Sequence, residues 1–295
     1  MRRILVLRGG ALGDLIVTLP ALALLRRRWP EARIELAGNP TAAQLARNRG
    51  VVDAVHSQHE ARWAALFGDD SLPAAFARWL TEFDLVLSYW PDPDGALARR
   101  FPLRAGQAFR TAPALPARSP AAAHYCEPLR DLGLETGNYF FPLTPLAAAV
   151  PPIPRGTIAI HPGSGSPRKN WPANRWRELL AWMPQPVAVV LGEAEAERWQ
   201  AGNLPAKATA WCNLPLESLV AHLASCRLFV GHDSGISHLA AACGAKCLLL
   251  FGPTNPMLWA PPTAAVQVLR RGPEVAAISV DDVQQAVTRA IADQS

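Results

Sequence analysis

Short apolar runs alternate with longer helical patterns along the chain, and this alternation restricts the possible fold more than any other feature. In the first half, strand-like runs cover Ile4 to Leu7, Arg33 to Leu36 and Leu85 to Ser88, and helical patterns cover residues 12–28 and 42–48. Strands that alternate with helices in this way usually pair in parallel, with helices packed against the sheet. The alternation therefore predicts an α/β fold with parallel sheets.

The second half of the chain repeats the order of strand, Gly-rich loop and helix with which the first half opens. Its expected strands are residues 157–160, 187–191, 228–230 and 246–251, and its expected helices are residues 174–183 and 216–224. Residues 142–154, between the halves, are rich in Pro and Ala, as is typical of a linker. Because 295 residues exceed the size of most single cores, we expect two similar domains, residues 1–150 and 151–295, with a cleft between them.

The charge of the chain is modestly basic, with a formal net charge of +5 and a pI near 9.2. Before residue 151 there are seventeen Arg and no Lys. Arginine forms paired hydrogen bonds with phosphate and carboxylate, which suits a polyanionic partner or an anionic membrane surface. A solvated surface is the alternative, and Arg26 to Arg28 at an expected helix end suit the helix dipole without a partner. No nucleic-acid recognition motif accompanies the charge, so we expect no nucleic-acid partner.

The sequence shows no recognisable membrane-spanning or secretory segment. No uncharged apolar stretch approaches the ~20 residues that cross a membrane, because Lys246 interrupts the best candidate. The apolar run after Met1 is too short for a signal peptide. Five cysteines without metal-type spacing indicate a reducing compartment. We expect a monomeric cytoplasmic protein, and peripheral contact with the inner face of the inner membrane stays open.

A polar segment with a central glycine, His232 to His238, follows the apolar run Leu228 to Gly231 and leads into an alanine-rich stretch. Where a strand ends and a helix begins at such a turn, backbone N–H groups can face an anion, while Asp233 and His238 supply polar side chains. The structural alternative is an N-capped helix after a buried strand. On this segment alone both interpretations stay open.

A second polar loop, Ile160 to Pro172, combines glycines and small hydroxyl residues with Lys169, one of three lysines in the chain. Such residues offer N–H and O–H donors and a positive charge, which together suit a diphosphate. The GK[ST] order of a Walker loop is absent, so we expect no ATP hydrolysis. The alternative is an ordinary turn with Trp171 packed beneath it.

The loop Arg8 to Asp14 follows the first strand and contains Gly9, Gly10 and Gly13. The glycine spacing is not GxGxxG, and the carboxylate of Asp14 would repel a dinucleotide pyrophosphate at the helix start, which disfavours a nicotinamide oxidoreductase. Asp14 suits a general base that takes a proton from an acceptor hydroxyl. Its structural alternative is a favourable charge at a helix N-terminus, worth roughly 0.3–1 kcal/mol.

Two weaker patterns complete the candidates. Asp92 and Asp94 form a DxD sequence that some glycosyltransferases use to bind a metal, but the Pro-Asp-Gly composition is that of a turn, and we expect no metal. Glu193 and Glu195 follow an expected strand and suit ribose hydroxyls, with a solvated helix start as the alternative.

Five segments in a fixed order resemble glycosyltransferase family 9, the ADP-heptose:lipopolysaccharide heptosyltransferase family. The resemblance covers nearly the whole chain, with Ile4 to Asp14 followed by Thr18 to Ala21, then His161 to Pro172, Asp233 to His238, and Leu250 to Thr254. It implies a GT-B fold of two Rossmann-like domains that face each other across a cleft. It also implies an inverting, metal-independent transfer of heptose from ADP-heptose, a co-substrate rather than a cofactor, to a lipopolysaccharide-core-type glycolipid or glycan.

The resemblance also implies a role for each matching position. Asp14 matches the catalytic base, in an acceptor-side loop with Gly9, Gly10 and Gly13, and Lys169 matches the lysine that contacts the donor phosphate or sugar. The other positions implied in donor binding are Ser164 and Gly165 at the phosphates, Ser234, Gly235 and Ile236 as a backbone cradle for the diphosphate, Asp233 and His238 towards the sugar, Glu195 at the ribose, with Glu193 open, and the backbone of Leu214 at adenine.

Three alternatives stay open. A glycosyltransferase of the same fold would use another donor sugar or a non-lipopolysaccharide acceptor, such as another glycan or a protein. A metal-dependent enzyme would use Asp92 and Asp94 and lose activity in EDTA. A non-catalytic nucleotide-sugar-binding protein would bind the donor without transfer or hydrolysis. By location alone, the acceptor contacts are expected among Arg62, Trp63, Arg99, Arg100 and Arg104.

Overall fold

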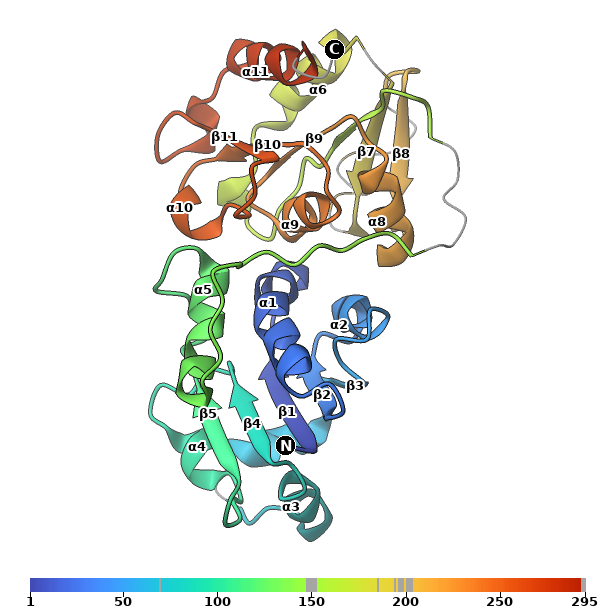
Figure 1. The fold of residues 1–295 in the computed structure, drawn as a ribbon. Helices are drawn as coiled ribbons and strands as arrows, with labels where there is room; N and C mark the ends of the chain where they lie inside the picture. The colour runs from blue at the N-terminus through green and yellow to red at the C-terminus, as the bar shows by residue number, and fades with distance from the viewer. Residues whose placement is uncertain are drawn as a thin grey trace. The chain divides into compact units, whose positions relative to one another are not determined.

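The computed structural model describes residues 1–68, 70–146, 153–184, 186–193, 195, 199 and 204–292, and the chain divides into two compact units (Figure 1). Unit 1 is Met1–Phe141 and unit 2 is Pro142–Ser295. The division lies before the predicted boundary at residue 150, because Leu143 is buried and its N–H donates to the carbonyl of Ala242 at 2.8 Å, within unit 2. Residues 147–152 of the predicted linker lie outside the described residues.

Unit 1 is built around a five-stranded parallel sheet in its described residues, in the order β3-β2-β1-β4-β5. The central strand is almost entirely buried, as is typical of a parallel strand covered on both faces. The strands are β1 (Arg3–Arg8), β2 (Arg33–Gly38), β3 (Ala54–Ser57), β4 (Leu85–Ser88) and β5 (Ala108–Thr111), and the α-helices are α1 (Leu12–Arg28), α2 (Pro40–Arg47), α3 (Ala74–Leu80), α4 (Ala96–Arg100) and α5 (Ala121–Cys126).

Unit 2 contains a six-stranded parallel sheet in its described residues, in the order β11-β10-β9-β6-β7-β8. Its core is apolar and packs α6 and α11 against the sheet. The strands are β6 (Ile158–Ile160), β7 (Val187–Leu191), β8 (Ala208–Cys212), β9 (Leu228–His232), β10 (Cys247–Phe251) and β11 (Val266–Arg270), and the described α-helices are α6 (Ala173–Trp182), α8 (Leu216–Ala224), α9 (Gly235–Ala242), α10 (Pro256–Trp259) and α11 (Val280–Ala292).

The predicted α/β class with parallel sheets is confirmed in both units. The predicted helices match α1, α2, α6 and α8 to within two residues at each end, and the predicted strands match central strands of both sheets. The edge strands β3, β5, β8 and β11 were not predicted, because they are partly exposed and mix polar with apolar residues. Helices α3, α4, α5, α10 and α11 were also not predicted.

The strand orders define a topological switch point in each sheet. In unit 1 the chain moves outward from β1 through β2 to β3, and then returns to place β4 on the other side of β1. In unit 2 it moves from β6 through β7 to β8, and then returns to place β9 on the other side of β6. Ligands of open α/β sheets bind outside the carboxyl ends of the strands at such points. We therefore expect a ligand site at the residues just after β1, β4, β6 and β9.

Candidate active site

Asp14 lies in the first turn of α1, directly after the loop that leaves β1. Its Oδ2 accepts a hydrogen bond from the backbone N–H of Ala11 at 2.8 Å, and its Oδ1 lies 2.9 Å from Nη2 of Arg8. Both oxygens are therefore held in fixed directions, yet 36% of the side chain is exposed. The carboxylate caps the helix, as the structural alternative required, and stays accessible to a substrate hydroxyl at the same time.

Arg8, at the end of β1, is the residue that fixes Asp14, and the sequence did not single it out. Only 5% of Arg8 is exposed, and its Nε donates to Oγ1 of Thr18 at 2.9 Å. The guanidinium lies 4.4 Å from the ring centroid of Tyr125, whose hydroxyl donates to the carbonyl of Ala114. A charged residue that ends an otherwise apolar buried strand requires a partner, and this was the available signal.

The glycines before Asp14 serve the geometry of this carboxylate. Gly10 has φ +106°, in the left-handed region that favours glycine, and a Cβ on it would lie 2.4 Å from Oδ2 of Asp14. Its N–H donates to Oε1 of Gln58 at 3.0 Å, which ties the loop to the segment after β3. Gly9 lies beside the same Gln58 and Trp90, and Gly13 is in the first turn of α1.

In unit 2, the segment after β9 forms an N-capped helix, and the N-terminus of this helix fits the predicted anion cradle, so the two interpretations are compatible. Ser234 is the N-cap of α9, and its Oγ accepts from the N–H of Ser237 at 3.3 Å. Gly235 and Ile236 occupy the first turn, where backbone N–H groups have no acceptor within the helix. These N–H groups and the helix dipole favour an anion at this end.

Lys169 brings a positive charge to this cradle. Its Nζ lies 2.7 Å from Oδ2 of Asp233, the residue before the N-cap, although the two are 64 positions apart. Asp233 is 6% exposed, whereas the lysine side chain is 30% exposed. The structure thus joins the two polar loops that the sequence predicted separately. His238, one turn into α9, is buried.

The remaining residues predicted to bind the nucleotide-sugar donor lie at the carboxyl ends of the neighbouring strands. Ser164 follows β6, and its Oγ donates within the loop to Oδ1 of Asn170 at 2.6 Å. Gly165 is exposed, with open space where a Cβ would stand. Leu214 is half-buried between β8 and α8, beside Asn213, whose N–H donates to the end of β7.

Of the two candidate glutamates, Glu195 is directed to the polar loop. Its Oε2 accepts from the N–H of Gly192 at 3.1 Å. A Cβ on Gly163 would lie 2.0 Å from Oε1 of Glu195, so the carboxylate packs directly against the loop after β6. Glu193 is exposed. The geometry therefore favours Glu195 over Glu193 as the residue nearer the loop after β6.

Two buried histidines, His161 and His232, contact the two polar loops of unit 2. The sequence analysis included them only as parts of longer motifs. Nε2 of His232 accepts from the N–H of Trp171 at 2.8 Å, and Oγ of Ser234 lies 3.4 Å from Nδ1 of His161. Burial lowers the pKa of His161 to about 3, with repulsion from His232 adding to the effect. Burial also lowers the pKa of His232 to about 4, despite the opposing influence of the Gly163 carbonyl and Asp233. Both imidazoles are therefore neutral at physiological pH.

These histidines predict acid sensitivity of unit 2. Because the folded-state pKa values lie below the ordinary 6.5, the unfolded chain binds more protons as the pH falls. This contribution to the free energy of unfolding is complete above pH 6.5 and is lost progressively as the pH falls through about 4 for His232 and about 3 for His161. We expect the melting temperature to drop over this range by differential scanning fluorimetry, and to drop less in His232→Gln, which keeps an acceptor for Trp171.

The control for this experiment is the exposed His59, whose replacement by Gln should leave the pH dependence as it is in the wild type. If His232→Gln retained the full acid-dependent drop, the buried imidazole would not be its source.

The two aspartates of the DxD sequence act as caps of α4. Oδ1 and Oδ2 of Asp92 accept from the N–H groups of Leu97 and Ala98 at 2.9 and 3.0 Å, and Oδ1 of Asp94 accepts from Ala96 at 3.2 Å. These contacts favour the turn interpretation over the metal one. Within the described residues, no group of three or more His, Cys, Asp or Glu is arranged to hold a metal ion.

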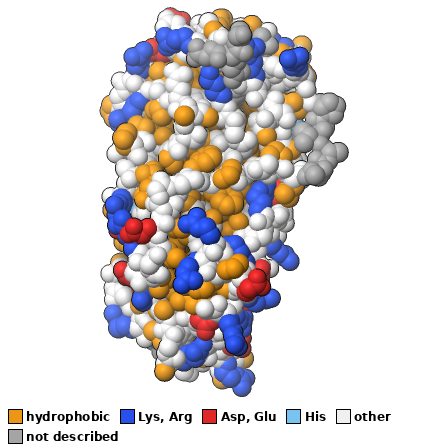
Figure 2. Space-filling view, in the orientation of Figure 1, with side chains coloured by type: hydrophobic (Ala, Val, Ile, Leu, Met, Phe, Trp, Pro, Cys, Tyr) orange, Lys and Arg blue, Asp and Glu red, His pale blue; other side chains and the backbone are white. Residues whose placement is uncertain are grey.

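Many arginines of unit 1 are paired with carboxylates. The pairs include Arg26 with Asp53, Arg104 with Asp84, and Arg118 with Glu127. On the face shown in Figure 2, blue and red side chains lie beside one another at several places. Arg104 contacts Asp84 at the amino end of β4, the edge of the sheet opposite to Asp14, so it is not near the proposed base. These pairs fit the surface alternative for Arg26, Arg104 and Arg118.

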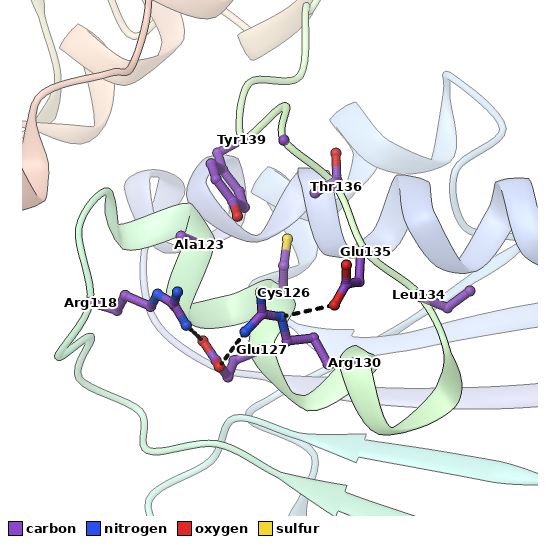
Figure 3. Close-up of a pocket in the computed structure, with 10 residues that line it drawn as sticks. Arg118, Ala123, Cys126, Glu127, Arg130, Leu134, Glu135, Thr136 and Tyr139 are labelled. Atoms are coloured by element: carbon purple, nitrogen blue, oxygen red, sulfur yellow. Dashed lines mark hydrogen bonds and ion pairs between the residues drawn. The ribbon is translucent and has the colours of Figure 1, made fainter.

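A pocket of about 250 Å³ lies between α5 and the segment after it (Figure 3). An alternating chain of charges crosses it, in which Arg130 lies 3.3 Å from Glu127 and 3.5 Å from Glu135, and Arg118 pairs with Glu127. Burial raises the pKa of the Cys126 thiol to about 12, so it is not a reactive nucleophile. This pocket contains none of the predicted site residues.

No helix in the described part of the chain combines the length and the apolarity needed to cross a membrane.

The two parallel α/β units define a GT-B architecture, the fold of a large class of glycosyltransferases. The chain belongs to glycosyltransferase family 9 (heptosyltransferase), whose family model matches residues 127–286. It is thus a glycosyltransferase, as the resemblance of its motifs implied.

Relatives and solved structures agree with this assignment. The chain is 31% identical to lipopolysaccharide heptosyltransferase 1 of Pseudomonas aeruginosa over 86% of this chain and 79% of the relative. Its fold is similar to that of the family 9 glycosyltransferase of Veillonella parvula, with a TM-score of 0.79, 19% identity, and 99% and 98% of the two chains covered. It is also similar to E. coli heptosyltransferase WaaC with ADP-2-deoxy-2-fluoro heptose, with a TM-score of 0.73, 21% identity, and 97% and 99% covered.

Proposed function

We propose that this enzyme transfers a heptose from ADP-heptose to a hydroxyl group of a lipopolysaccharide-core-type acceptor, with inversion and without a metal ion. The observation that carries the proposal is the pairing of Lys169 with Asp233 at the N-terminus of α9, at the switch point of the unit 2 sheet. A lysine and free helix N–H groups suit the diphosphate of a nucleotide sugar. The names of the relatives supply the sugar and the class of acceptor.

The proposed reaction is a single displacement. Asp14 takes the proton of the acceptor hydroxyl as its oxygen attacks the anomeric carbon of the donor. The bond from that carbon to the diphosphate oxygen breaks, and ADP leaves with the bonding electron pair. Lys169 and the N–H groups of Gly235 and Ile236 stabilise the charge that develops on the leaving diphosphate. Attack opposite to the leaving group inverts the anomeric configuration.

The other donor contacts in this proposal follow the ends of the strands. Ser164 and Gly165 bind the phosphates together with Ser234, and Asp233 and His238 lie towards the sugar. Glu195 binds the ribose hydroxyls, because its carboxylate packs against the phosphate loop. The backbone of Leu214 meets adenine. A glycolipid acceptor would bring a monomer of this enzyme into peripheral contact with the membrane that carries it.

Thermal stabilisation by a panel of nucleotide sugars tests the donor assignment. A ligand that binds only the folded state raises the melting temperature, and the rise grows with the ratio of its concentration to its Kd. We expect ADP-heptose and ADP to stabilise the enzyme more than UDP-, GDP- or dTDP-sugars at equal concentration. Selective stabilisation by a nucleotide sugar with another base or sugar would show that the donor is that compound and not ADP-heptose. Stabilisation by ADP-heptose with neither transfer nor hydrolysis would indicate a binding protein instead.

A further inference from the structure

Unit 1 contains a second open pocket, of about 620 Å³, at the switch point of its own sheet. We name it the aromatic pocket. The described residues that line it include Gly10 after β1, Gln58, His59, Glu60, Trp63 and Phe67 after β3, and Trp90 after β4. Its volume lies in the range of small-molecule sites.

The aromatic pocket adjoins the loop of the proposed base through a single residue. Gly10 lines the pocket, and a Cβ on Gly10 would lie 2.4 Å from Oδ2 of Asp14. Gln58, also in the lining, accepts the hydrogen bond from the N–H of Gly10. A molecule in the pocket would therefore lie next to the loop that carries the carboxylate.

An aromatic surface forms one side of the pocket. Phe67 is 51% exposed, and its ring lies 6.1 Å from that of Trp90 at an interplanar angle of 35°. Trp63 and Trp90 are nearly buried, and Nε1 of Trp63 donates to the carbonyl of Ser57, so this indole offers no unsatisfied donor. An exposed phenyl ring backed by fixed indoles suits the apolar face of a flat ring.

The described lining offers polar groups but no cation. It contains no Lys or Arg, and its carboxylate, Glu60, accepts from the N–H of Ser57 at 2.7 Å and lies 2.8 Å from Nε of Arg62. That arginine is also 2.8 Å from Nδ1 of His56 and lies over the ring of Trp63, so its charge is already engaged by these partners. A carboxylated or phosphorylated ligand would lose hydration here without gaining an ion pair.

We propose that the aromatic pocket binds an uncharged sugar ring of the acceptor, stacked on Phe67, with its hydroxyl groups towards Gln58 and His59. This inference rests on the proposed function and narrows it. It specifies that the sugar unit of the acceptor that lies beside the Asp14 loop is uncharged. An acceptor that carries an anionic group places that group outside this pocket.

The test is a binding titration of the full chain without donor, read by the fluorescence of its tryptophans. The probes are a methyl hexopyranoside and the corresponding methyl hexuronide, which differ by one carboxylate. We expect the neutral glycoside to bind at least about tenfold more tightly. Phe67→Ala should weaken its binding by roughly tenfold, whereas Phe67→Tyr should retain it. Trp182→Ala, which removes a partly exposed aromatic residue of unit 2, should leave it unchanged.

Binding of the uronide as tight as that of the neutral glycoside, no binding of the neutral glycoside, or unchanged binding by Phe67→Ala would each overturn the proposal. These outcomes do not depend on transfer. If the neutral glycoside binds through Phe67 but no ADP-sugar is used as a donor, the proposed function fails and the pocket assignment stands.

Discussion

Replacing Asp14 by Asn is expected to lower kcat by about 10²–10⁴-fold, the usual contribution of a positioned general base. Asparagine keeps one oxygen, which accepts from the N–H of Ala11 at the start of α1, whereas the ion pair with Arg8 is lost, so the melting temperature of the variant is measured beside its activity. It cannot take up the proton of an attacking hydroxyl. The proposed donor site lies in unit 2, so the affinity for ADP-heptose should stay at the wild-type value. Steady-state transfer assays and donor titrations measure the two quantities separately.

Asp94→Asn is the matched control for this substitution. It also removes a carboxylate that caps a helix in unit 1, and Asp94 belongs to the DxD sequence of the metal-dependent alternative. We expect turnover close to wild type in Asp94→Asn. Wild-type turnover in Asp14→Asn would remove Asp14 as the base, and a large loss in Asp94→Asn that divalent cations modulate would favour the metal-dependent enzyme.

Lys169→Ala is expected to weaken donor binding by roughly 30-fold or more and to lower kcat as well. The change removes a positive charge from the diphosphate site and leaves Asp233, which is 6% exposed, without its ion-pair partner. Loss of one partner of a buried pair typically costs about 2–5 kcal/mol. The unpaired carboxylate would in addition repel the diphosphate. Isothermal titration with ADP and steady-state kinetics with ADP-heptose give the two effects.

Two further variants distinguish a general effect of positive charge near the diphosphate from the specific effect of the Lys169–Asp233 ion pair. Arg168→Ala removes an exposed positive charge one residue away, and we expect it to change donor affinity little. Lys169→Ala combined with Asp233→Asn should bind ADP more tightly than Lys169→Ala alone, because the repulsive carboxylate is gone. Unchanged donor affinity and rate in Lys169→Ala would exclude this lysine from the site.

The sequence predicted those strands whose burial makes them apolar throughout. Val187–Leu191 and Cys247–Phe251 are buried along their whole length and stand out as continuous apolar runs. Edge strands such as Ala208–Cys212 mix exposed, half-buried and buried residues over too few positions to be distinguished from a loop. Strand order is not encoded locally at all, so the switch points could not be predicted from the sequence.

For the candidate site as well, local sequence patterns could be predicted, whereas contacts between distant segments could not. The Gly-rich loop before Asp14 and the polar segment before α9 are local patterns, and the sequence alone indicates both as candidate sites. The contact between Lys169 and Asp233 joins two loops that only the pairing of β6 with β9 brings together. The aromatic pocket depends likewise on the neighbouring ends of β1 and β4.

The most direct test of the central claim is an NMR time course of wild-type enzyme with ADP-heptose and a lipopolysaccharide-core oligosaccharide in the presence of EDTA. The account predicts that ADP and the glycosylated acceptor form in equal amounts, that EDTA does not slow the reaction, and that the new linkage has the anomeric configuration opposite to that of the donor. Transfer that requires a divalent cation, a product with retained configuration, or no use of ADP-heptose while another nucleotide sugar reacts would contradict it.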